Sequence, residues 1–369
     1  MKIKSEKGVL TVWLEGRIDS ENSEHVEEAL LQALREHIPE KMVLDMEKLT
    51  YISSAGLRIL LRCHKQIPST LILENVRDEV YDILTLTGFE DLFEVHRALR
   101  DFTFPRGEKL ADSVNGQIYS LPDDNMLKVF NRRTSLEEVK QERQYAHVAL
   151  VNGIPTAIPY DVVKVADTYG IIYEAMDMTS LARMVTGTPE LLQEYAEQFA
   201  GFLKQLHETP VKGSGLPDIK ERYSRWMDLA GPRLKREEYQ KLERLIREIP
   251  DRDTYVHGEI NLTNVIVHRG EMMVMDMGGS GYGHPLIDLQ GIYAALIKME
   301  QEQPLYCSTY FGVSGKNCKL FWDHFLRTYM SGRSEKDLTV LQSLLEQYYI
   351  LKKNLVAKLQ GEFADADIM

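Results

Sequence analysis

The sequence predicts an α/β domain at residues 1–103 and, at residues 104–369, an α+β domain in which a small β-rich lobe precedes a large helical lobe. Its length of 369 residues exceeds the usual size of a single hydrophobic core. Short strand-like and helix-like segments alternate near the N-terminus, whereas helical periodicity dominates the C-terminal half. Between them, residues 101–112 lose periodicity and carry Pro105 and Gly107, as expected of a linker.

The first domain is expected to contain short strands and amphipathic helices packed against them. We expect an edge or hairpin strand at "GVLTVWLEG" and a helix at "SENSEHVEEALLQALREHI", with Ser20 or Asn22 as its N-cap. Short buried strands are predicted at "KMVLDM" and "STLILENV". A further amphipathic helix is predicted at "DEVYDILTLTGFEDLF".

In the second domain, the β-rich lobe is expected at about 108–178 and the helical lobe at about 179–369. A turn in "NGQIYSLPDDNMLKVFN" should join two strands, and "YGIIYEAMD" should form another. A helix is predicted at "SLEEVKQERQYAHVALVNG", where Ser135 and Glu138 form a capping box and Gly153 ends the helix. The apolar periodicity of "TPELLQEYAEQFAGFLKQLHETP" predicts a core helix of the second lobe.

Composition and charge exclude several functions. A net charge of −12 argues against a nucleic-acid partner, which would require dense Lys and Arg on one face. We find no signal peptide and no apolar run long enough to span a membrane. The three cysteines, Cys63, Cys307 and Cys318, have no metal-ligand spacing, so we expect a reducing cytoplasm. Averaged over the chain, the acidic surplus would favour a cationic substrate by steering.

Three polar residues in "YVHGEINLTNVIVHRGEMMVMDMGGSGYG" indicate phosphoryl transfer. This chemistry requires a protein to hold magnesium and to orient a hydroxyl for in-line attack. A hairpin at "VIVHRGEMMVMDMG" would bring Asp276 beside Asn264, and both supply the oxygen ligands that magnesium prefers. Glu259 precedes the hairpin on a loop, within reach of a nucleophile. Asp276 alone could also be an ordinary turn cap.

The stretches "HGEINLTN" and "VMDMGGSGYGHPLIDL" resemble the catalytic loop and metal-binding segment of the aminoglycoside phosphotransferase and choline kinase families, which share the protein-kinase-like fold. The matching residues are His257, Gly258, Asn264, Asp276, Pro285, Asp288 and Leu289. Two positions differ from the family pattern. Glu259 replaces the catalytic aspartate, and His284 replaces an acidic residue before Pro285.

The resemblance implies that ATP and Mg²⁺ bind in the second domain. It makes Lys128 the phosphate-binding lysine and Glu142 its ion-pair partner, although a strand lysine is ordinarily solvated. Backbone groups of Glu174 and Met176 would bind adenine. Of the family's glycine-rich phosphate loop, Gly116 alone remains.

The resemblance also implies that Glu259 is the general base. Its extra methylene changes the reach of the carboxylate by about 1.5 Å unless the loop compensates. Because positioning and electrostatics supply most of the rate enhancement in this chemistry, we expect a slower enzyme and not an inactive one.

A helix in the first domain is expected to begin within "LDMEKLTYISSAGLRILLRCHKQ", and its serines could be simple N-caps. The stretch resembles the STAS domain of anti-sigma factor antagonists, in which a serine at a helix start is phosphorylated. Alignment at Gly56 and Leu57 places Ser54 at the regulated serine and Ser53 at the family's aspartate. Phosphate at Ser54 would gain from the helix dipole and alter the surface offered to a protein partner.

Two functions follow from these features. In the first, the chain is an ATP- and Mg²⁺-dependent phosphotransferase acting on a hydroxyl of a small molecule, with a STAS module that regulates it or binds a protein partner. In the second, a weakly active or inactive kinase-like domain binds nucleotide and controls interactions of the STAS module. A variant of the second has the kinase-like domain phosphorylate Ser54.

Overall fold

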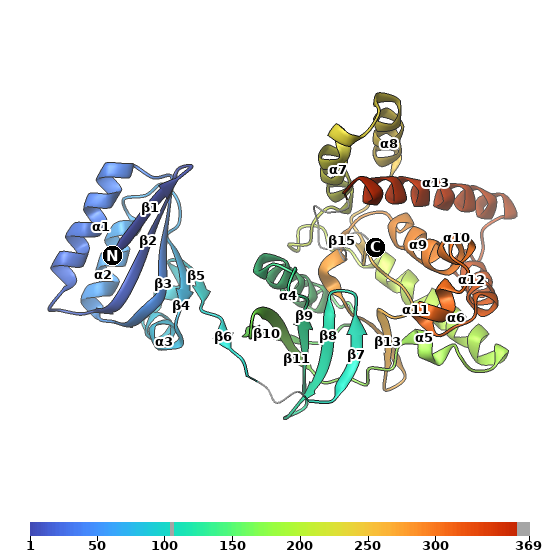
Figure 1. Cartoon of the computed structure of the whole chain (residues 1–369), viewed down its shortest axis with the longest axis horizontal. Helices are drawn as coiled ribbons and strands as arrows, with labels where there is room; N and C mark the ends of the chain where they lie inside the picture. The colour runs from blue at the N-terminus through green and yellow to red at the C-terminus, as the bar shows by residue number, and fades with distance from the viewer. Residues whose placement is uncertain (104–106, 360–369) are drawn as a thin grey trace. The chain divides into compact units, whose positions relative to one another are not determined.

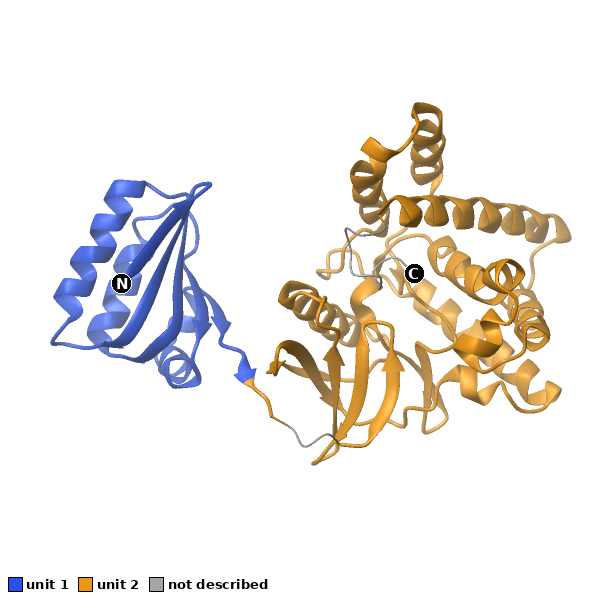
Figure 2. Ribbon diagram, in the orientation of Figure 1, with its two compact units in different colours: residues 1–100 blue, residues 101–369 orange. Residues whose placement is uncertain are grey.

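The computed structural model describes residues 1–103 and 107–359. It divides the chain into two compact units, residues 1–100 and 101–369, shown in blue and orange in Figure 2. The division follows Arg100, three residues before the boundary predicted from the sequence. The predicted linker residue Pro105 lies outside the described residues.

The first unit contains a five-stranded sheet with helices packed against it (Figure 1). The strand order is β1-β2-β3-β4-β5, where β1 and β2 form an antiparallel hairpin and the remaining neighbours are parallel. The strands are β1 (Lys2–Glu6), β2 (Val9–Ile18), β3 (Lys41–Ile52), β4 (Ile72–Val76) and β5 (Glu94–Arg97). The helices are α1 (Ser23–His37), α2 (Ser54–His64) and α3 (Asp78–Leu86).

Gly56 lets α2 approach the sheet closely. A Cβ at this position would lie 2.5 Å from Ile52 Cγ1 and 2.9 Å from Ile18 Cγ2. Both isoleucines end the strands β3 and β2, so the start of α2 packs directly on the ends of these two strands. The first turn of α2 is therefore held in place by apolar packing against the ends of β2 and β3.

The β-rich lobe of the second unit is a six-stranded sheet in the order β6-β10-β11-β9-β8-β7. Its strands are β6 (Arg100–Asp101), β7 (Lys109–Ser113), β8 (Gly116–Leu121), β9 (Asn125–Phe130), β10 (Pro159–Val165) and β11 (Thr168–Glu174). The helix α4 (Leu136–Val151) begins with the predicted capping box of Ser135 and Glu138. It packs against β10 and β11.

The expectation of a linker through residue 112 is wrong at its C-terminal end. Residues Lys109–Ser113 form β7, which pairs antiparallel with β8. β7 is an edge strand with exposed and half-buried residues, so it has no apolar run of the kind that indicates a strand in a sequence. The lobe thus has one more strand at the edge where the phosphate loop was expected.

The helical lobe contains two short pairs of antiparallel strands. β12 (Tyr255–Val256) pairs with β15 (Gly281–Tyr282), and β13 (Val265–His268) pairs with β14 (Glu271–Val274). The longer helices are α6 (Pro189–Glu208), α7 (Ile219–Ala230), α8 (Arg236–Glu248), α9 (Leu286–Tyr293), α12 (Gly315–Tyr329) and α13 (Glu335–Leu359). The shorter ones are α5 (Leu181–Met184), α10 (Met299–Glu302) and α11 (Tyr306–Phe311).

Two pieces of the helical lobe frame the site described below. A 3-10 turn, η3 (Met277–Gly279), follows β14 and packs against α4. The long helix α13 packs against α7, α8 and α9. Within the described ranges, no helix combines the length and the apolar character needed to cross a membrane.

Candidate active site

A buried ion cluster joins the two lobes of the second unit. Lys128 on β9 donates a hydrogen bond from Nζ to Glu142 Oε1 on α4, at 2.6 Å, and another to Asp276 Oδ1 after β14, at 2.7 Å. The Lys128 side chain is 1% exposed. Residues that lie far apart in the sequence thus meet in one cluster, as the motif order predicts.

The pKa values of the cluster reflect one ammonium held between two carboxylates. Burial alone would lower the pKa of Lys128, but Asp276 and Glu142 raise it above its ordinary value. Burial raises the pKa of Glu142 more than Lys128 lowers it. Burial also acts to raise the pKa of Asp276, but the charge and hydrogen bond of Lys128, with a hydrogen bond from Ser113, lower it overall. Asp276 is therefore the more acidic of the two carboxylates in the cluster.

Asp276 has an unusual backbone conformation for a residue other than glycine. Its φ of 60° and ψ of 63° are left-handed, directly after the hairpin that the sequence predicts. This turn lets the chain leave β14 and begin η3, and it points the carboxylate at Lys128. The second carboxylate oxygen accepts a hydrogen bond of 2.9 Å from Ser113 Oγ at the end of β7.

Asn264 lies next to Asp276 through the predicted hairpin. Its carbonyl accepts a hydrogen bond of 2.9 Å from the Met275 amide. The Asn264 side-chain Nδ2 donates to the Glu259 carbonyl at 3.0 Å, so its Oδ1 points elsewhere. Among the hydrogen bonds of the described residues, this oxygen accepts none. Asn264 and Asp276 thus offer hard oxygens of the kind that Mg²⁺ prefers, and a nucleotide and water would complete its coordination.

The loop that carries Glu259 is anchored by the buried carboxylate of Asp288 on α9. Asp288 Oδ2 accepts from the His257 amide at 2.8 Å, and Oδ1 accepts from the Gly258 amide at 2.7 Å. His207 on α6 also lies 3.0 Å from Asp288 Oδ2 through its Nε2. The His257 ring donates to the Met275 carbonyl at 2.8 Å, which ties the loop to the metal segment.

The Glu259 side chain lies over Gly279 of η3. A Cβ at Gly279 would be 2.8 Å from Glu259 Cγ and 3.0 Å from Glu259 Cδ, so the position leaves room for glycine alone. The residue is half-buried, and among the described residues its carboxylate makes no hydrogen bond or ion pair. An unpaired carboxylate at this point is able to accept a proton from a hydroxyl.

The predicted adenine-binding segment follows β11. The Glu174 amide donates to the Ile158 carbonyl at 3.1 Å, so its amide is occupied within the sheet. The Met176 amide donates no hydrogen bond to any of the residues that the structure describes. The carbonyl of Glu174 and the amide of Met176 are therefore the backbone groups suited to adenine.

The turn between β7 and β8 stands where a glycine-rich phosphate loop was expected. It is short, with Val114 and Asn115 between the paired residues Ser113 and Gly116. A Cβ at Gly116 would lie 2.1 Å from the Val129 carbonyl oxygen, so this glycine serves the close pairing of β8 with β9. The Asn115 amide of this turn donates to Ser113 Oγ at 3.3 Å, and Ser113 in turn donates to Asp276, so the turn is tied to the buried cluster.

The sequence reading missed Ser113 and Arg222. Arg222 on α7 donates from Nη1 to the Gly279 carbonyl at 2.7 Å and from Nη2 to the Ser280 carbonyl at 3.3 Å. Neither residue belongs to a sequence motif, because Ser113 directly follows the predicted linker and Arg222 lies in a helix of ordinary charge. His284, which departs from the family pattern, accepts from the Leu286 amide at the start of α9.

In the first unit, Ser53 and Ser54 stand at the start of α2, as predicted. Ser53 is the N-cap, and its hydroxyl accepts a hydrogen bond of 3.4 Å from the Gly56 amide. Ser54 is the first residue of the helix and is exposed. Its hydroxyl is therefore accessible, next to the amides at a helix N-terminus.

Two family models match the chain. The model for the STAS domain matches residues 1–102, and the model for the phosphotransferase enzyme family (APH) matches residues 115–307, more than half of the chain. These matches confirm the two resemblances that the motifs predict, and with them the fold class. The first unit is a STAS domain, and the second is a kinase-like domain.

Several known proteins are similar to parts of the chain. BtrV of Bordetella bronchiseptica, a candidate anti-sigma factor antagonist, is 36% identical over 100 residues, which span 26% of this chain and 85% of BtrV. A ternary complex of streptomycin, ATP and APH(2'')-IIa is 14% identical with a TM-score of 0.48, covering 73% of this chain and 90% of that chain. An anti-sigma factor antagonist from Mycobacterium paratuberculosis is 21% identical with a TM-score of 0.25, covering 27% and 85%. Neither solved structure is similar enough to assign an activity or a substrate here.

Proposed function

Because the chain belongs to the phosphotransferase enzyme family, we propose that its second unit transfers the terminal phosphate of ATP to a hydroxyl group of a small molecule. We propose further that its STAS domain binds a protein partner. The observation that carries the first proposal is the buried contact of Lys128 with both Glu142 and Asp276. A buried ammonium between two buried carboxylates costs free energy, because all three charged groups lose their hydration. A cluster of this kind suits a site that binds a polyanion.

Each residue of the cluster has a part in this function. Lys128, held by Glu142, contacts phosphate oxygens, and Ser113 and the turn amides add hydrogen bonds. Asn264 and Asp276 hold Mg²⁺, which would neutralise charge on the phosphates when bound. The Glu174 carbonyl and the Met176 amide bind adenine.

Glu259 completes the reaction as general base. The acceptor oxygen forms a bond to the terminal phosphorus while the bond from that phosphorus to the bridging oxygen of ADP breaks. The hydroxyl proton passes to the Glu259 carboxylate and then to solvent. Asp288 positions the loop for this step, because it binds the amides of His257 and Gly258, directly before Glu259.

Calorimetry with the wild type and Asp276→Asn tests the nucleotide site. We expect the wild type to bind Mg-ATP, and the variant to bind it at least tenfold more weakly, because a magnesium ligand is lost. ADP release in the same samples, with and without a panel of alcohols, measures turnover. Equal binding and equal ADP release by the two proteins would contradict the proposal.

Variants of Glu259 test the base separately. Glu259→Gln should lower kcat by about 10²–10⁴-fold and leave the affinity for Mg-ATP unchanged, because base catalysis contributes about this much. Glu259→Asp restores the residue of the family pattern and should keep measurable turnover. If Glu259→Gln kept the wild-type kcat, the carboxylate would not be the base.

A second candidate function is supported by the exposed Ser54 at the start of α2 and by the similarity of the first unit to BtrV. In it, the second unit binds nucleotide, and phosphate on Ser54 alters how the STAS domain binds its protein partner. Intact mass of the chain before and after Mg-ATP would show the added phosphate. Ser54→Ala should abolish that phosphate, with Ser53→Ala as the matched control. If the mass were unchanged and alcohols stimulated ADP release, the second candidate function would be excluded and only the first would remain.

A further inference from the structure

Arg222 binds the turn that follows the metal segment. Its Nη1 donates to the Gly279 carbonyl at 2.7 Å, and its Nη2 donates to the Ser280 carbonyl at 3.3 Å. One planar guanidinium thus holds two consecutive carbonyl groups. Because the donors of a guanidinium are fixed relative to one another, this contact sets the orientation of both peptide groups more firmly than a single donor would.

The side chain of Glu259 lies against the α carbon of the same glycine. A Cβ at Gly279 would lie 2.8 Å from Glu259 Cγ, 3.0 Å from Glu259 Cδ and 2.9 Å from the His257 carbonyl oxygen. The Gly279 carbonyl oxygen also approaches Gly258, where a Cβ would lie 2.3 Å from it. Gly279 therefore contacts the loop that carries Glu259, while its carbonyl is held by Arg222.

Packing and not polar contact fixes the proposed base. In the part of the chain that the structure describes, the Glu259 carboxylate takes part in no hydrogen bond or ion pair. Glutamate also has one more rotatable bond than the aspartate of the family pattern, so more conformational freedom must be removed to hold its carboxylate in one place. The contact with Gly279 limits that freedom, and it depends on how the turn at 279–280 is oriented.

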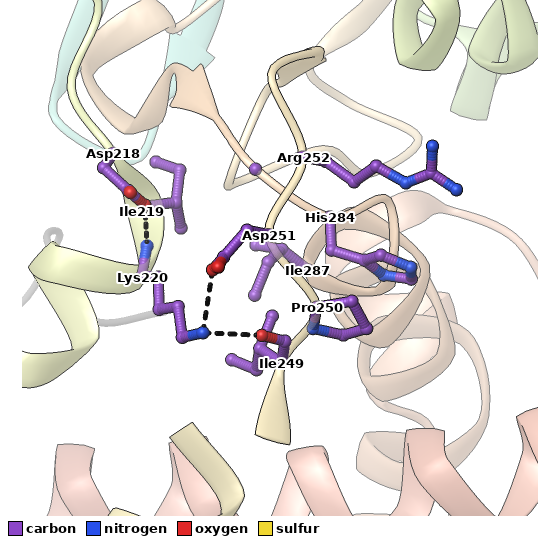
Figure 3. A pocket seen from close by; sticks show the side chains of 10 residues that line it. Asp218, Ile219, Lys220, Ile249, Pro250, Asp251, Arg252, His284 and Ile287 are labelled. Atoms are coloured by element: carbon purple, nitrogen blue, oxygen red, sulfur yellow. Dashed lines mark hydrogen bonds and ion pairs between the residues drawn. The ribbon is translucent and has the colours of Figure 1, made fainter. Parts of the chain in front are cut away.

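The helix that carries Arg222 is fixed at its start. The Asp218 side chain caps α7 at the Lys220 amide, at 2.8 Å. Lys220 Nζ donates to the Ile249 carbonyl and to Asp251 Oδ1, both at 2.8 Å, beside a small pocket (Figure 3). These bonds tie the first turn of α7 to the segment that follows α8.

The same helix start is joined to the strand that follows the turn. Asp218 forms a parallel β-bridge with Tyr282 of β15. A Cβ at Gly281 would lie 2.4 Å from Ile219 Cδ1, so the first residue of α7 packs closely on β15. Arg222 therefore reaches from a fixed helix start to the two residues directly before β15.

We propose that Arg222 is a positioning residue for Glu259. By holding the two carbonyls of the turn, it keeps the Glu259 side chain where its carboxylate accepts the proton of the acceptor hydroxyl. This inference rests on the proposed phosphotransferase function and adds a residue to it. Misplacing a catalytic group by about 1 Å lowers a rate by up to about 10²-fold, so a residue that acts through another has a measurable effect on the rate.

A double-mutant cycle tests this role. The rate is that of ADP release from Mg-ATP in single turnover, with water, glycerol, glucosamine or choline as acceptor, and the fastest acceptor is used. Arg222→Gln should lower the rate about tenfold or more. In the background of Glu259→Gln, which has no carboxylate to position, the same change should lower the rate less than about twofold. A residue that only stabilises the fold would lower both rates by the same factor.

The matched control is Arg225→Gln, the same change of charge at an exposed position of the same helix. It should leave the rate and the affinity for Mg-ATP unchanged. Hydrogen exchange measures the turn without turnover: amides of residues 277–281 should exchange faster in Arg222→Gln than in the wild type or in Arg225→Gln. Equal exchange in all three proteins would contradict the proposal.

Arg222→Lys is a milder variant that keeps the charge and one donor. It should lower the rate at least about threefold when Glu259 is present, because a lysine does not replace an arginine that binds two acceptors. Its effect should also disappear in Glu259→Gln. This variant keeps the test decisive if Arg222→Gln does not fold, and circular dichroism shows whether each variant is folded.

The outcomes separate this inference from the proposed function. Failure of the wild type to bind Mg-ATP, or a wild-type rate in Glu259→Gln, would remove the proposed site or base, and the positioning role with it. If both proposals hold, a wild-type rate in Arg222→Gln or an equal loss in both backgrounds would overturn the positioning role alone. A folded Arg222→Gln that binds Mg-ATP more weakly would also overturn it, because Arg222 would then act on the nucleotide site.

Discussion

The interiors of the two units differ in chemistry. In the first unit the buried core is apolar throughout, built from residues such as Leu10, Leu44 and Leu60. The second unit buries polar and charged residues among its apolar ones. In the part of the chain that the structure describes, all buried polar and charged residues belong to it: Lys128, Glu142, Thr156, Thr168, His207, His257, Asn264, Asp276, Ser280, Asp288 and Gln290.

This difference in buried polar residues indicates where in each unit a function is expected. Burying charge costs free energy unless each group is paired, so a fold retains such groups where they contribute chemistry or specificity. The second unit places several of them in the cluster of Lys128, Glu142 and Asp276 and around the loop that carries Glu259. The first unit has an apolar core and exposes the start of α2, where we propose that a protein partner binds. Substitutions in the two interiors should therefore have different consequences.

The largest expected effect is that of Lys128→Met. The change leaves Glu142 and Asp276 as buried carboxylates without their cation, so the second unit should lose about 3–5 kcal/mol of unfolding free energy. Chemical denaturation followed by fluorescence and calorimetry measures it. Lys319→Met, which removes an exposed partner of Asp323, is the control and should cost less than about 1 kcal/mol. An equal loss in both variants would remove the distinction between buried and exposed charge.

The next effect is that of Asp288→Asn, which keeps the shape of the loop anchor and removes its charge. We expect a loss of about 1.5–3 kcal/mol, because the amides of His257 and Gly258 and the ring of His207 bind a charged acceptor. The kcat should fall as well, since the loop positions Glu259. Wild-type stability in this variant would show that the anchor is dispensable.

The same variant has a predicted pH dependence. Burial raises the pKa of Asp288, but the hydrogen bond and charge of His207, with His257, lower it below its ordinary value of 3.8. A depressed pKa stabilises the fold above the unfolded-state pKa, near 3.9, and this contribution is lost as pH falls through the folded-state pKa. As the pH falls below about 4, the wild type should therefore lose more unfolding free energy than Asp288→Asn.

A smaller effect is expected in the first unit, from Gly56→Ala. The added methyl would overlap Ile52 and Ile18, and overpacking of a core costs about 1–3 kcal/mol. Only the unfolding transition that reports through Trp13 should shift, because Trp226 and Trp322 lie in the second unit. Affinity for Mg-ATP should not change. A shift of the second unit's transition instead would contradict the separation of the two units.

The smallest effect is that of Ser54→Asp. A negative charge at the first residue of α2 should stabilise the first unit by about 0.3–1 kcal/mol, and added salt should reduce the gain. Thermal unfolding at low and high ionic strength measures both. Arg58→Gln, at an exposed position one turn further along the helix, is a control of similar exposure and should show no comparable gain. A destabilising effect of Ser54→Asp would argue against phosphate at this serine.

The sequence predicted the parts of the site that lie on local motifs. The hairpin that brings Asp276 beside Asn264 and the capping box at Ser135 follow from turn and cap chemistry within a few residues. The meeting of Lys128, Glu142 and Asp276 followed from the resemblance to a family, because residues so far apart leave no local pattern.

The parts that the sequence did not predict depend on tertiary packing. Arg222 lies on a helix whose charge pattern is ordinary, and only the tertiary fold brings its guanidinium to the Gly279 carbonyl, beside Glu259. The edge strand β7 was hidden because Lys109–Ser113 is half-exposed and adjoins a glycine and a proline. In each case the missing information is which surface packs against which.

The left-handed backbone of Asp276 separates two kinds of mutational tolerance at one position. Glycine and asparagine enter this conformation readily, whereas β-branched residues are strained there. A library of all substitutions selected for folding alone would therefore retain glycine and asparagine with aspartate. A library selected for nucleotide turnover would retain aspartate alone. The backbone limits which residues are physically allowed at position 276, and the proposed binding of magnesium would select aspartate among them.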